Sequence, residues 1–505
     1  MWCGMPSGRW GSRIRWISSG LAFLFAIVAI GFAGGTRAAE SAADGSSNLS
    51  SISFSPAVIK LNNPGSQGVT TKTTTIKVTM TAYDAQGEVI TPSAANPLNL
   101  ALFGAADGLI TTPEMTITSA GPVTFTYSGG YFTNPVTLEA WIGNDYGAQS
   151  IGVMQFLPKN RPACSYAAQS FTIPTICGGA TDPTDCAANN MTGGLQVNAA
   201  VGVNSPNASA FIPYTIDTGS LGVIVPVSDL GPDAIGPAGP GKKYYDSSGN
   251  IFTGNYYLAR VNLLISVNDG TPIYVQTNPI KVLAVNYAYC APNAADCSYP
   301  TPTTNPQIHY LGVGFDRNNT TDGDYFDSPA DNAFLEVTDA NNGTDITPGY
   351  ILTSTNVTLG LSSSTGYEFT KLKPNAASPG DWIQMPGCFG FPDINKQSYC
   401  GGLLLDVGID HMYLNLKPAR RPKDAVSDST VPTGTYVNIL TGTIKNPSMS
   451  YEFQFEPDDA TGPAPEEINW VNLVPGVFIN TGRRPLIAYN YMFDAQCGQV
   501  GFQPN

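Results

Sequence analysis

Apolar and polar residues alternate along much of the first third of the chain. The segment 76–82 reads IKVTMTA, and the segment 136–142 reads VTLEAWI, with an apolar residue at nearly every second position. A period of two is typical of a β-strand with one buried face. Turn-forming residues at 84–87 and 128–130 interrupt these runs. The pattern predicts a β-sandwich of about immunoglobulin size over residues 48–157.

A second alternating pattern leads into a tight polar turn. Residues 195–203 (LQVNAAVGV) alternate, the chain turns at 205–207, and it returns to residues 217–220 (DTGS). The apolar run 221–226 follows directly. Asp217 is therefore expected to lie on a glycine turn between two strands.

A second carboxylate stands in a similar place. Asp406 follows three leucines, Leu403 to Leu405, and the chain continues as Val407, Gly408 and Ile409. The two turns share the aspartate and the glycine two residues later, but the neighbouring residues differ.

The composition favours strands and turns over long helices. The 505 residues include 53 Gly and 40 Pro, and only 12% of them are charged. This balance favours strands and turns, and the length predicts two to four structural units. We therefore expect an all-β protein.

The first 39 residues predict export. They carry four arginines and no acidic residue, with an apolar stretch at 21–33 followed by small residues. This is typical of a signal peptide, so we expect a secreted, periplasmic or cell-surface protein without a membrane span in its mature form. An uncleaved N-terminal anchor is the alternative. Without those arginines the net charge of −14 becomes −18, which argues against a nucleic acid partner.

Eight cysteines follow the one at position 3, an even number that predicts disulfides in an exported chain. They are Cys164, Cys177, Cys186, Cys290, Cys297, Cys388, Cys400 and Cys497. No two have the C-x-x-C spacing of a structural zinc site. The first three lie in residues 158–193, which we interpret as a cysteine-containing linker.

The segments around both aspartates resemble the pepsin-like aspartic peptidases. A hairpin leads into DTGS, and residues 244–257 are similar to the flap hairpin of that family. Residues 310–315 (YLGVGF), the approach at 387–406, and the closing segments 475–479, 491–494 and 499–502 follow in family order. The resemblance implies a two-lobed double β-barrel, with an N-lobe over 194–360 and a C-lobe over 361–505. The preceding sandwich resembles bacterial immunoglobulin-like modules.

The resemblance also implies an activity and its residues. Two apposed carboxylates that share one proton provide both the base and the acid for peptide hydrolysis by water, without a metal or another cofactor. The residues implied are Asp217 and Asp406 as the catalytic pair, Thr218, Gly219, Ser220 and Gly408 as supporting residues, and Tyr245 as the flap tyrosine. A polypeptide is the expected substrate.

The second turn departs from the family pattern. The family has Thr or Ser where Val407 stands, so one of two cross-loop hydrogen bonds must be absent. Ile409 cannot bond the outer oxygen of Asp406 as Ser220 can bond that of Asp217, so Asp406 is expected to be less well oriented and more readily protonated. Two alternatives follow: an exported aspartic endopeptidase, which could also process its own chain, or an inactive pepsin-fold protein that binds peptides or protein partners.

Other candidate sites are weaker. Neither His309 nor His411 lies in a serine or cysteine nucleophile motif; His411 either perturbs Asp406 or is structural, and we favour a structural role. The acidic segment 316–331 superficially resembles a calcium loop but lacks the glycine and glutamate of an EF-hand, so we expect a solvated turn.

Overall fold

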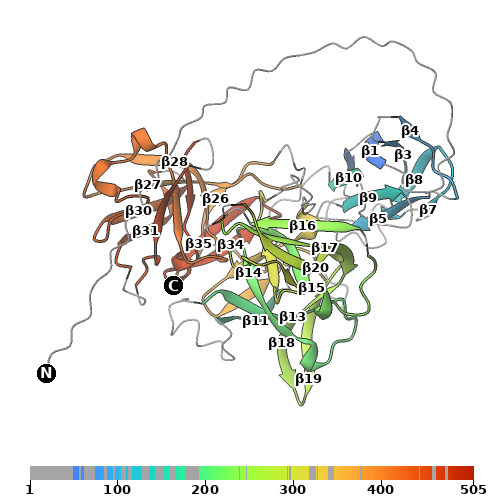
Figure 1. Cartoon of the computed structure of the whole chain (residues 1–505), viewed down its shortest axis with the longest axis horizontal. Coiled ribbons are helices and arrows are strands. Elements are labelled where there is room, and N and C mark those ends of the chain that lie inside the picture. Colours follow the sequence, from blue (N-terminus) through green and yellow to red (C-terminus); the bar gives the residue numbers. More distant parts are fainter. Residues whose placement is uncertain are drawn as a thin grey trace, which may run out of the picture. The chain divides into compact units, whose positions relative to one another are not determined.

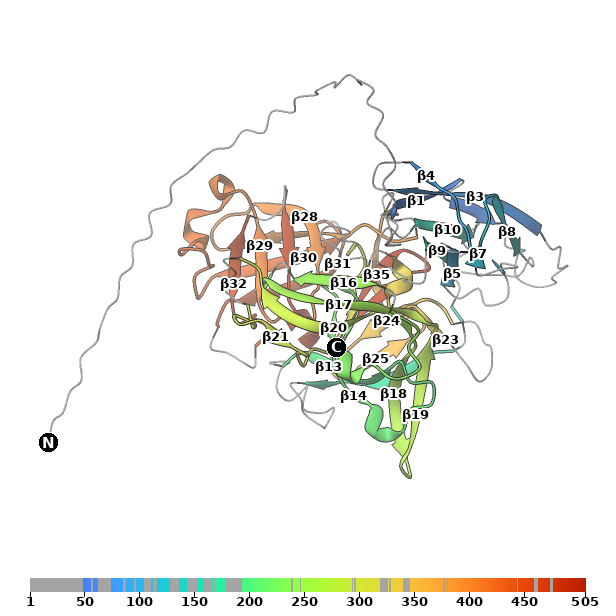
Figure 2. The same ribbon diagram turned by 45° about the vertical axis from the view of Figure 1, so that its right-hand side comes forward.

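The structure is a computed structural model. It describes residues 49–55, 58–61, 74–84, 88–94, 97–103, 110–111, 116–127, 136–142, 152–158, 166–167, 169–177 and 193–505, the last with gaps at 238, 246, 293, 295–296, 318–325, 327, 339–345, 376–377, 379, 443, 458–461 and 473–475. The signal peptide predicted for residues 1–39 and much of the linker predicted for 158–193 lie outside the described residues. Every regular element described is a β-strand or a short 3₁₀ helix (Figures 1 and 2), which confirms the predicted all-β class.

The strands between Leu49 and Pro158 form two five-stranded sheets. One sheet contains β1 (Leu49–Ser55), β3 (Thr74–Asp84), β4 (Val89–Ile90), β6 (Ile110–Thr111) and β8 (Pro122–Tyr127). The other contains β2 (Val58–Leu61), β5 (Leu98–Phe103), β7 (Thr116–Ile117), β9 (Val136–Ile142) and β10 (Gly152–Pro158). Buried side chains of both sheets, among them Val78, Phe125 and Leu138, form one hydrophobic cluster. The alternating pattern therefore provides the inner faces of a sandwich; its likeness to immunoglobulin modules stays a prediction.

A twelve-stranded sheet contains Asp217. Its strands are β12 (Ile176–Cys177), β13 (Leu195–Val201), β14 (Ile212–Asp217), β15 (Leu221–Pro226), β16 (Pro240–Tyr245), β17 (Asn250–Ala259), β18 (Val261–Asn268), β19 (Thr271–Thr277), β20 (Ile280–Cys290), β21 (Thr303–Thr304), β22 (Tyr310–Val313) and β23 (Val337–Thr338). The predicted hairpin is present as β13 and β14, with Ala199 opposite Ile212.

A seven-stranded sheet leads to Asp406. Its strands are β27 (Met385–Gly390), β28 (Ser398–Leu404), β29 (Met412–Asn415), β30 (Tyr436–Gly442), β31 (Pro447–Gln454), β32 (Ile468–Val471) and β33 (Phe478–Asn480). A six-stranded sheet combines one strand of the predicted linker, β11 (Phe171–Pro174), with strands of both predicted lobes: β24 (Gly349–Leu352), β25 (Asn356–Leu359), β26 (Glu368–Lys371), β34 (Tyr489–Asp494) and β35 (Gln499–Pro504).

The short 3₁₀ helices lie in connections between strands. They are η1 (Ala208–Ala210), η2 (Val227–Asp229), η4 (Pro329–Asp331), η5 (Pro418–Arg420), η6 (Lys423–Ala425) and η7 (Arg484–Ile487).

The same strand arrangement occurs behind both aspartates. In the twelve-stranded sheet, β14 runs parallel to β22, which pairs antiparallel with β15. In the seven-stranded sheet, β28 runs parallel to β33, which pairs antiparallel with β29. Each aspartyl turn thus joins two strands that hydrogen-bond to one central strand, and this central strand fixes the position of the turn.

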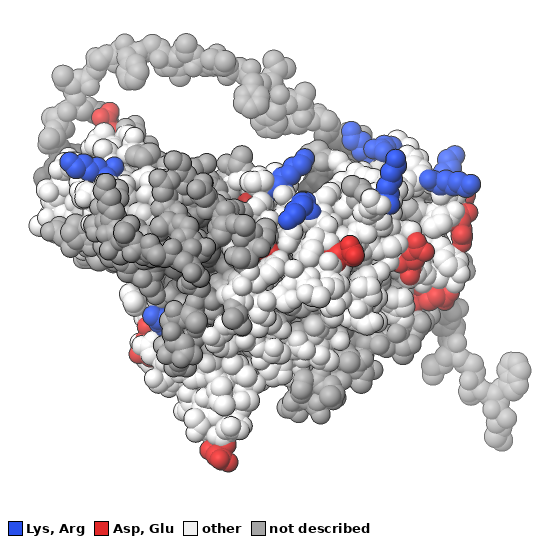
Figure 3. Space-filling model, turned by 180° about the vertical axis from the view of Figure 1, so that it is seen from behind, with Lys and Arg blue, Asp and Glu red and all other residues white. Residues whose placement is uncertain are grey.

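Disulfides and surface charge agree with the composition. Cys290 is bonded to Cys297 and Cys388 to Cys400, and Cys177 is disulfide-bonded as well, which confirms the predicted use of cysteine. The face drawn in Figure 3 is largely uncharged among the residues described, in keeping with the 12% of charged residues.

Candidate active site

Asp217 is held in place by its own turn. The amide N of Gly219 donates to its Oδ1 at 2.7 Å, and the Ser220 hydroxyl donates to its Oδ2 at 2.5 Å. The side chain is buried. Gly219 and Ser220 thus donate to both carboxylate oxygens of Asp217, and their supporting roles in catalysis stay predictions.

Asp406 has the same number of donors, but one comes from another strand. The amide N of Gly408 donates to Oδ1 at 3.0 Å, as Gly219 does for Asp217. The Oδ2 atom accepts from Nδ2 of Asn480, at the end of β33, at 2.8 Å. Ile409 was expected to leave this oxygen of Asp406 without a donor and the carboxyl group less well oriented. That expectation is wrong, because Asn480 supplies the donor that Ile409 lacks.

The two turns lie against each other. A Cβ built at Gly219 would lie 2.4 Å from Oδ2 of Asp406, and a Cβ built at Gly408 would lie 2.6 Å from Oδ1 of Asp217. No side chain fits at either position, since real Cβ atoms do not approach an oxygen so closely. The glycines therefore allow each carboxylate to lie beside the opposite turn.

Thr218 links the two turns by hydrogen bonds. Its Oγ1 donates to the carbonyl of Leu405 at 2.5 Å and accepts from the amide N of Val407 at 3.0 Å. The Val407 side chain is fully buried and has no hydroxyl to reciprocate. The structure therefore contains the cross-loop bonds predicted for Thr218, while Val407 contributes packing alone.

Burial raises the pKa of Asp406 to about 7, and the charge of Asp217 and a hydrogen bond with it act in the same direction. The bond from Asn480 and the positive charge of Arg317 lower this pKa. The direction agrees with the expectation that Asp406 is readily protonated, but its main cause is burial rather than a missing donor. Asp406 thus holds a proton under conditions in which an exposed aspartate would not.

A cavity of about 260 Å³ opens beside the pair. It is lined by Asp217, Gly219, Tyr245, Ser247, Ser248, Asn250, Phe252, Ser298, Ile308, Tyr310, Asp406, Gly408 and Ile409. Among these residues only the two aspartates carry a charge. The cavity therefore places uncharged side chains next to two ionisable groups.

Tyr245 belongs to the wall of this cavity. It ends β16, whose partner β17 returns from Asn250, and its ring lies 5.9 Å edge-to-face from Phe252 and 5.7 Å from Tyr310. The position is compatible with the predicted flap tyrosine, a role that stays a prediction.

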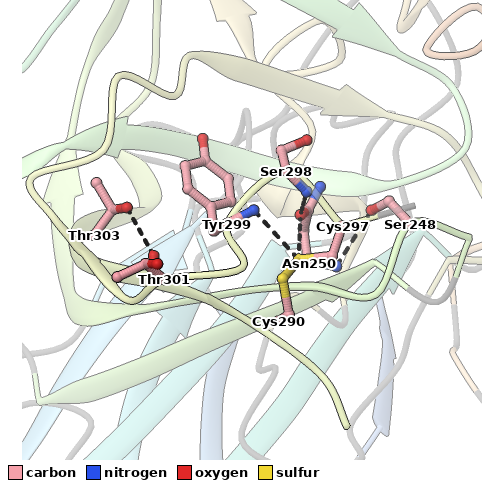
Figure 4. The surroundings of a disulfide bond; sticks show 8 residues. All are labelled: Ser248, Asn250, Cys290, Cys297, Ser298, Tyr299, Thr301 and Thr303. Carbon is pink, nitrogen blue, oxygen red and sulfur yellow. Dashed lines mark hydrogen bonds between the residues drawn. A yellow bond between two sulfur atoms is a disulfide. The ribbon is translucent and has the colours of Figure 1, made fainter. Parts of the chain in front are cut away.

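A disulfide holds the polar end of the cavity (Figure 4). Cys297, bonded to Cys290 at the end of β20, brings the amide N of Ser298 within 2.9 Å of Oδ1 of Asn250. The amide N of Asn250 in turn donates to the Ser248 hydroxyl at 3.3 Å. Hydroxyl and amide groups thus form one end of the cavity, and the rings of Phe252 and Tyr310 form its apolar wall.

Sequence reasoning missed Tyr310 as a cavity residue and missed Asn480 altogether. In the parallel pairing, Thr215 is opposite Tyr310 and Leu404 is opposite Asn480, each two residues before an aspartate. The sequence contained an indication of both residues. YLG at 310–312 and NTG at 480–482 each end in glycine, and each begins with the residue that is paired with the position two residues before an aspartate. The chosen closing segment, 475–479, stopped one residue too early to include Asn480.

His411 does not contact the pair. Its imidazole lies 3.7 Å from Glu467 and 4.0 Å from Glu466, and it is about two-fifths exposed. The buried charge nearer the turn is Arg483, whose Nη1 donates to the carbonyl of Val407 at 3.4 Å and whose Nη2 lies 3.5 Å from Asp410. This arginine supports the backbone of the second turn.

The aspartates at the two ends of the acidic segment 316–331 contact other residues of the protein. Asp316 accepts from the side-chain amide of Asn375 and from the backbone of Gln384, and Asp331 lies 3.8 Å from Lys281. Residues 318–325 and 327 lie outside the described residues. Across the residues described, no three His, Cys, Asp or Glu side chains gather in a way that could hold a metal ion.

No protein-family model and no curated protein matches the chain. Among solved structures, the aspartic proteinase of Irpex lacteus is similar at 13% identity and a TM-score of 0.39, over 67% of this chain and 98% of that one. A likeness at this level does not bear on activity, so we base the function on the geometry of the site. Within the described residues no helix has the length and hydropathy needed to cross a membrane.

Proposed function

We propose that this protein is an exported aspartic endopeptidase that hydrolyses peptide bonds with a water molecule activated by Asp217 and Asp406. The observation that carries the proposal is the reciprocal contact of the two turns, in which each loop glycine lies against the opposite carboxylate. Both carboxyl groups are buried, and the pKa of Asp406 is raised by burial and by the charge of Asp217. This is the condition under which two acids share one proton.

The chemistry follows from that shared proton. The water oxygen attacks the carbonyl carbon while Asp217 accepts a proton from the water. At the same time Asp406 gives its proton to the carbonyl oxygen. In the tetrahedral diol that results, Asp217 gives its proton to the amide nitrogen and Asp406 takes a proton from a diol hydroxyl, so that the C–N bond breaks. An acid and an amine leave, and the dyad returns to its single proton.

The surroundings of the dyad support a polypeptide substrate. The cavity presents aromatic rings and uncharged hydroxyl and amide groups, and it brings no competing charge to the two aspartates. The disulfides and the sequence of residues 1–39 support export to a secreted, periplasmic or cell-surface location.

Cleavage of an unfolded polypeptide at acidic pH tests the proposal. The Asp217→Asn variant should lose activity on the order of 10³-fold or more, because the amide cannot accept the proton from water. Asp393→Asn, at an exposed aspartate outside the cavity, is the matched control and should cleave normally. A statine-type transition-state mimic should inhibit the wild type. Absence of cleavage of any protein substrate from about pH 2 to 7 would count against an enzyme.

The second candidate is an inactive protein that holds peptides or a partner in the same cavity. It is favoured by Val407 and Ile409, which place no hydroxyl around the second turn. Saturable binding of the statine mimic without any product from peptide substrates would support it. A self-processing enzyme is a variant of the first proposal; if the full-length chain is the only mature species, that variant is wrong.

A further inference from the structure

The two aspartates obtain their second side-chain donor from different places in the chain. Ser220, three residues after Asp217, donates to Oδ2 of that residue at 2.5 Å. Ile409 stands three residues after Asp406 and has no donor. The equivalent oxygen of Asp406 instead accepts from Asn480, 74 residues further along the chain.

The orientation of the Asn480 amide is fixed. Its Oδ1 accepts from the backbone N of Gly482 at 3.0 Å, so Nδ2 must be the atom that faces Asp406. The side chain is only 8% exposed, and the backbone of Asn480 is held between Leu404 of β28 and Tyr413 of β29. An amide held in this way can donate to Asp406 but cannot accept from it.

The turn that fixes the amide is itself constrained. Gly482 has a positive φ of 62°, and a Cβ at this position would lie 2.8 Å from the carbonyl oxygen of His411. Glycine is therefore required there for conformation and for space. The local backbone thus keeps the N–H of Gly482 aimed at Asn480.

We propose that Asn480 is a positioning residue that replaces the missing loop hydroxyl and holds the carboxyl group of Asp406 in a fixed orientation beside Asp217. The amide N of Gly408 donates to Oδ1 and Nδ2 of Asn480 donates to Oδ2, so the two donors together fix the plane of the carboxyl group. Both Oδ1 atoms lie beside Gly408, since a Cβ there would be 2.6 Å from that of Asp217 and 3.2 Å from that of Asp406. The fixed orientation therefore keeps Oδ1 of Asp406 close to the glycine beside which Oδ1 of Asp217 lies. This inference rests on the proposed aspartic peptidase function.

The electrostatics of Asp406 agree with this role. Burial and the charge of Asp217 raise the pKa of Asp406, whereas the bond from Asn480 lowers it. Asn480 therefore makes it easier for Asp406 to give up its proton during turnover. Without this bond, Asp406 would hold the proton to higher pH and in a less defined orientation.

Three variants test the proposal. Asn480→Leu removes the donor at nearly constant volume, and Asn480→Leu with Ile409→Thr adds a hydroxyl where Ser220 stands in the first turn. Asn490→Leu, an asparagine of β34 outside the cavity lining, is the matched control. The carboxyl ¹³C shifts of labelled aspartates are titrated by NMR, and kcat and KM are measured across the same pH range.

We expect Asn480→Leu to move the upper apparent pKa of the dyad upward and to lower kcat on the order of 10²-fold, with a smaller change in KM. The added Ile409→Thr should return the titration toward the wild type and recover kcat by about tenfold or more. A residue that only stabilised the fold would lower the melting temperature without moving the titration. A wild-type titration and kcat in Asn480→Leu, or no recovery in the double variant, would overturn the inference.

The titration needs no turnover, so it separates this inference from the proposed function. If the wild type cleaves no peptide, the function fails, and an unchanged dyad titration in Asn480→Leu would still be needed to reject the role of Asn480. If Asn480→Leu does not fold, Asn480→Ser replaces it, because the shorter side chain loses its reach to Asp406 while remaining polar.

Discussion

At the scale of single residues, the site depends on which atoms can donate. Asp217 and Asp406 each receive one backbone and one side-chain hydrogen bond, yet the side-chain donors are a serine hydroxyl and an asparagine amide. A hydroxyl can also accept a hydrogen bond, whereas the fixed amide cannot. The two carboxyl groups are therefore not interchangeable. Burial raises the pKa of Asp406, and the bond from Asn480 lowers it again in part.

Thr218→Val should destabilise the protein by about 1–3 kcal/mol, because the amide N of Val407 would lose its acceptor in a buried position. Activity should fall with it, since the same oxygen links the turns. Thermal or denaturant unfolding measures the first effect and peptide cleavage the second. Thr218→Ser keeps the hydroxyl and serves as the control; a loss as large as that of valine would show that the methyl group, and not the bond, matters.

At the scale of elements, local patterns predicted the β13–β14 hairpin and both glycine turns. The cross-loop bonds of Thr218, which join residues 187 and 189 positions apart, were expected only from the family resemblance. Asn480 was not predicted, because its contact with Asp406 arises from the parallel pairing of β28 and β33, which no local pattern encodes. Tyr310 was likewise named only as part of the segment 310–315 and not as part of the cavity wall.

The β17 and β20 strands and the disulfide that follows them should affect substrate binding more than chemistry. Replacing Cys290 and Cys297 by Ser frees the loop that carries Ser298 from its position near Asn250. We expect KM to rise several-fold, on the order of a lost hydrogen bond or two, with kcat little changed.

The second disulfide provides the comparison for that experiment. Cys388 and Cys400 are opposite each other in the β27–β28 pair, away from the cavity lining. Replacing both by Ser should lower stability without raising KM. Equal KM values for the two double variants would show that the Cys290–Cys297 disulfide does not shape the site.

At the scale of the whole molecule, buried carboxyl groups make stability depend on pH. The pKa of Asp406 rises from 3.8 to about 7 and that of Asp381 from 3.8 to about 6, both mainly through burial. Between the ordinary and raised values the folded state binds more protons than the unfolded state, so these groups stabilise the fold at acidic pH. Their contribution is full below about pH 4 and is lost as the pH rises through the raised values.

Asp406→Asn should therefore flatten the pH dependence of stability. One such group changes the free energy of unfolding by at most about 1.4 kcal/mol per pH unit, and the asparagine does not titrate. Denaturant unfolding at several pH values from about 4 to 7 measures the slope in the wild type and the variant. The wild type should lose stability toward neutral pH more steeply, and identical slopes would show that Asp406 titrates normally in the folded protein.

The reciprocal glycine contact also determines the stage of chain synthesis at which the pair of aspartates can first form. Asp217 lies beside Gly408, Asp406 lies beside Gly219, and Asn480 comes from a strand late in the chain. A growing chain that has not yet reached residue 480 lacks β33, which pairs with β28 and β29, and lacks the donor to Asp406, so its two carboxylates are not yet held as a pair. Under the proposed peptidase function, the polypeptide would thus carry no hydrolytic capacity during synthesis, and activity would begin only with the completed fold.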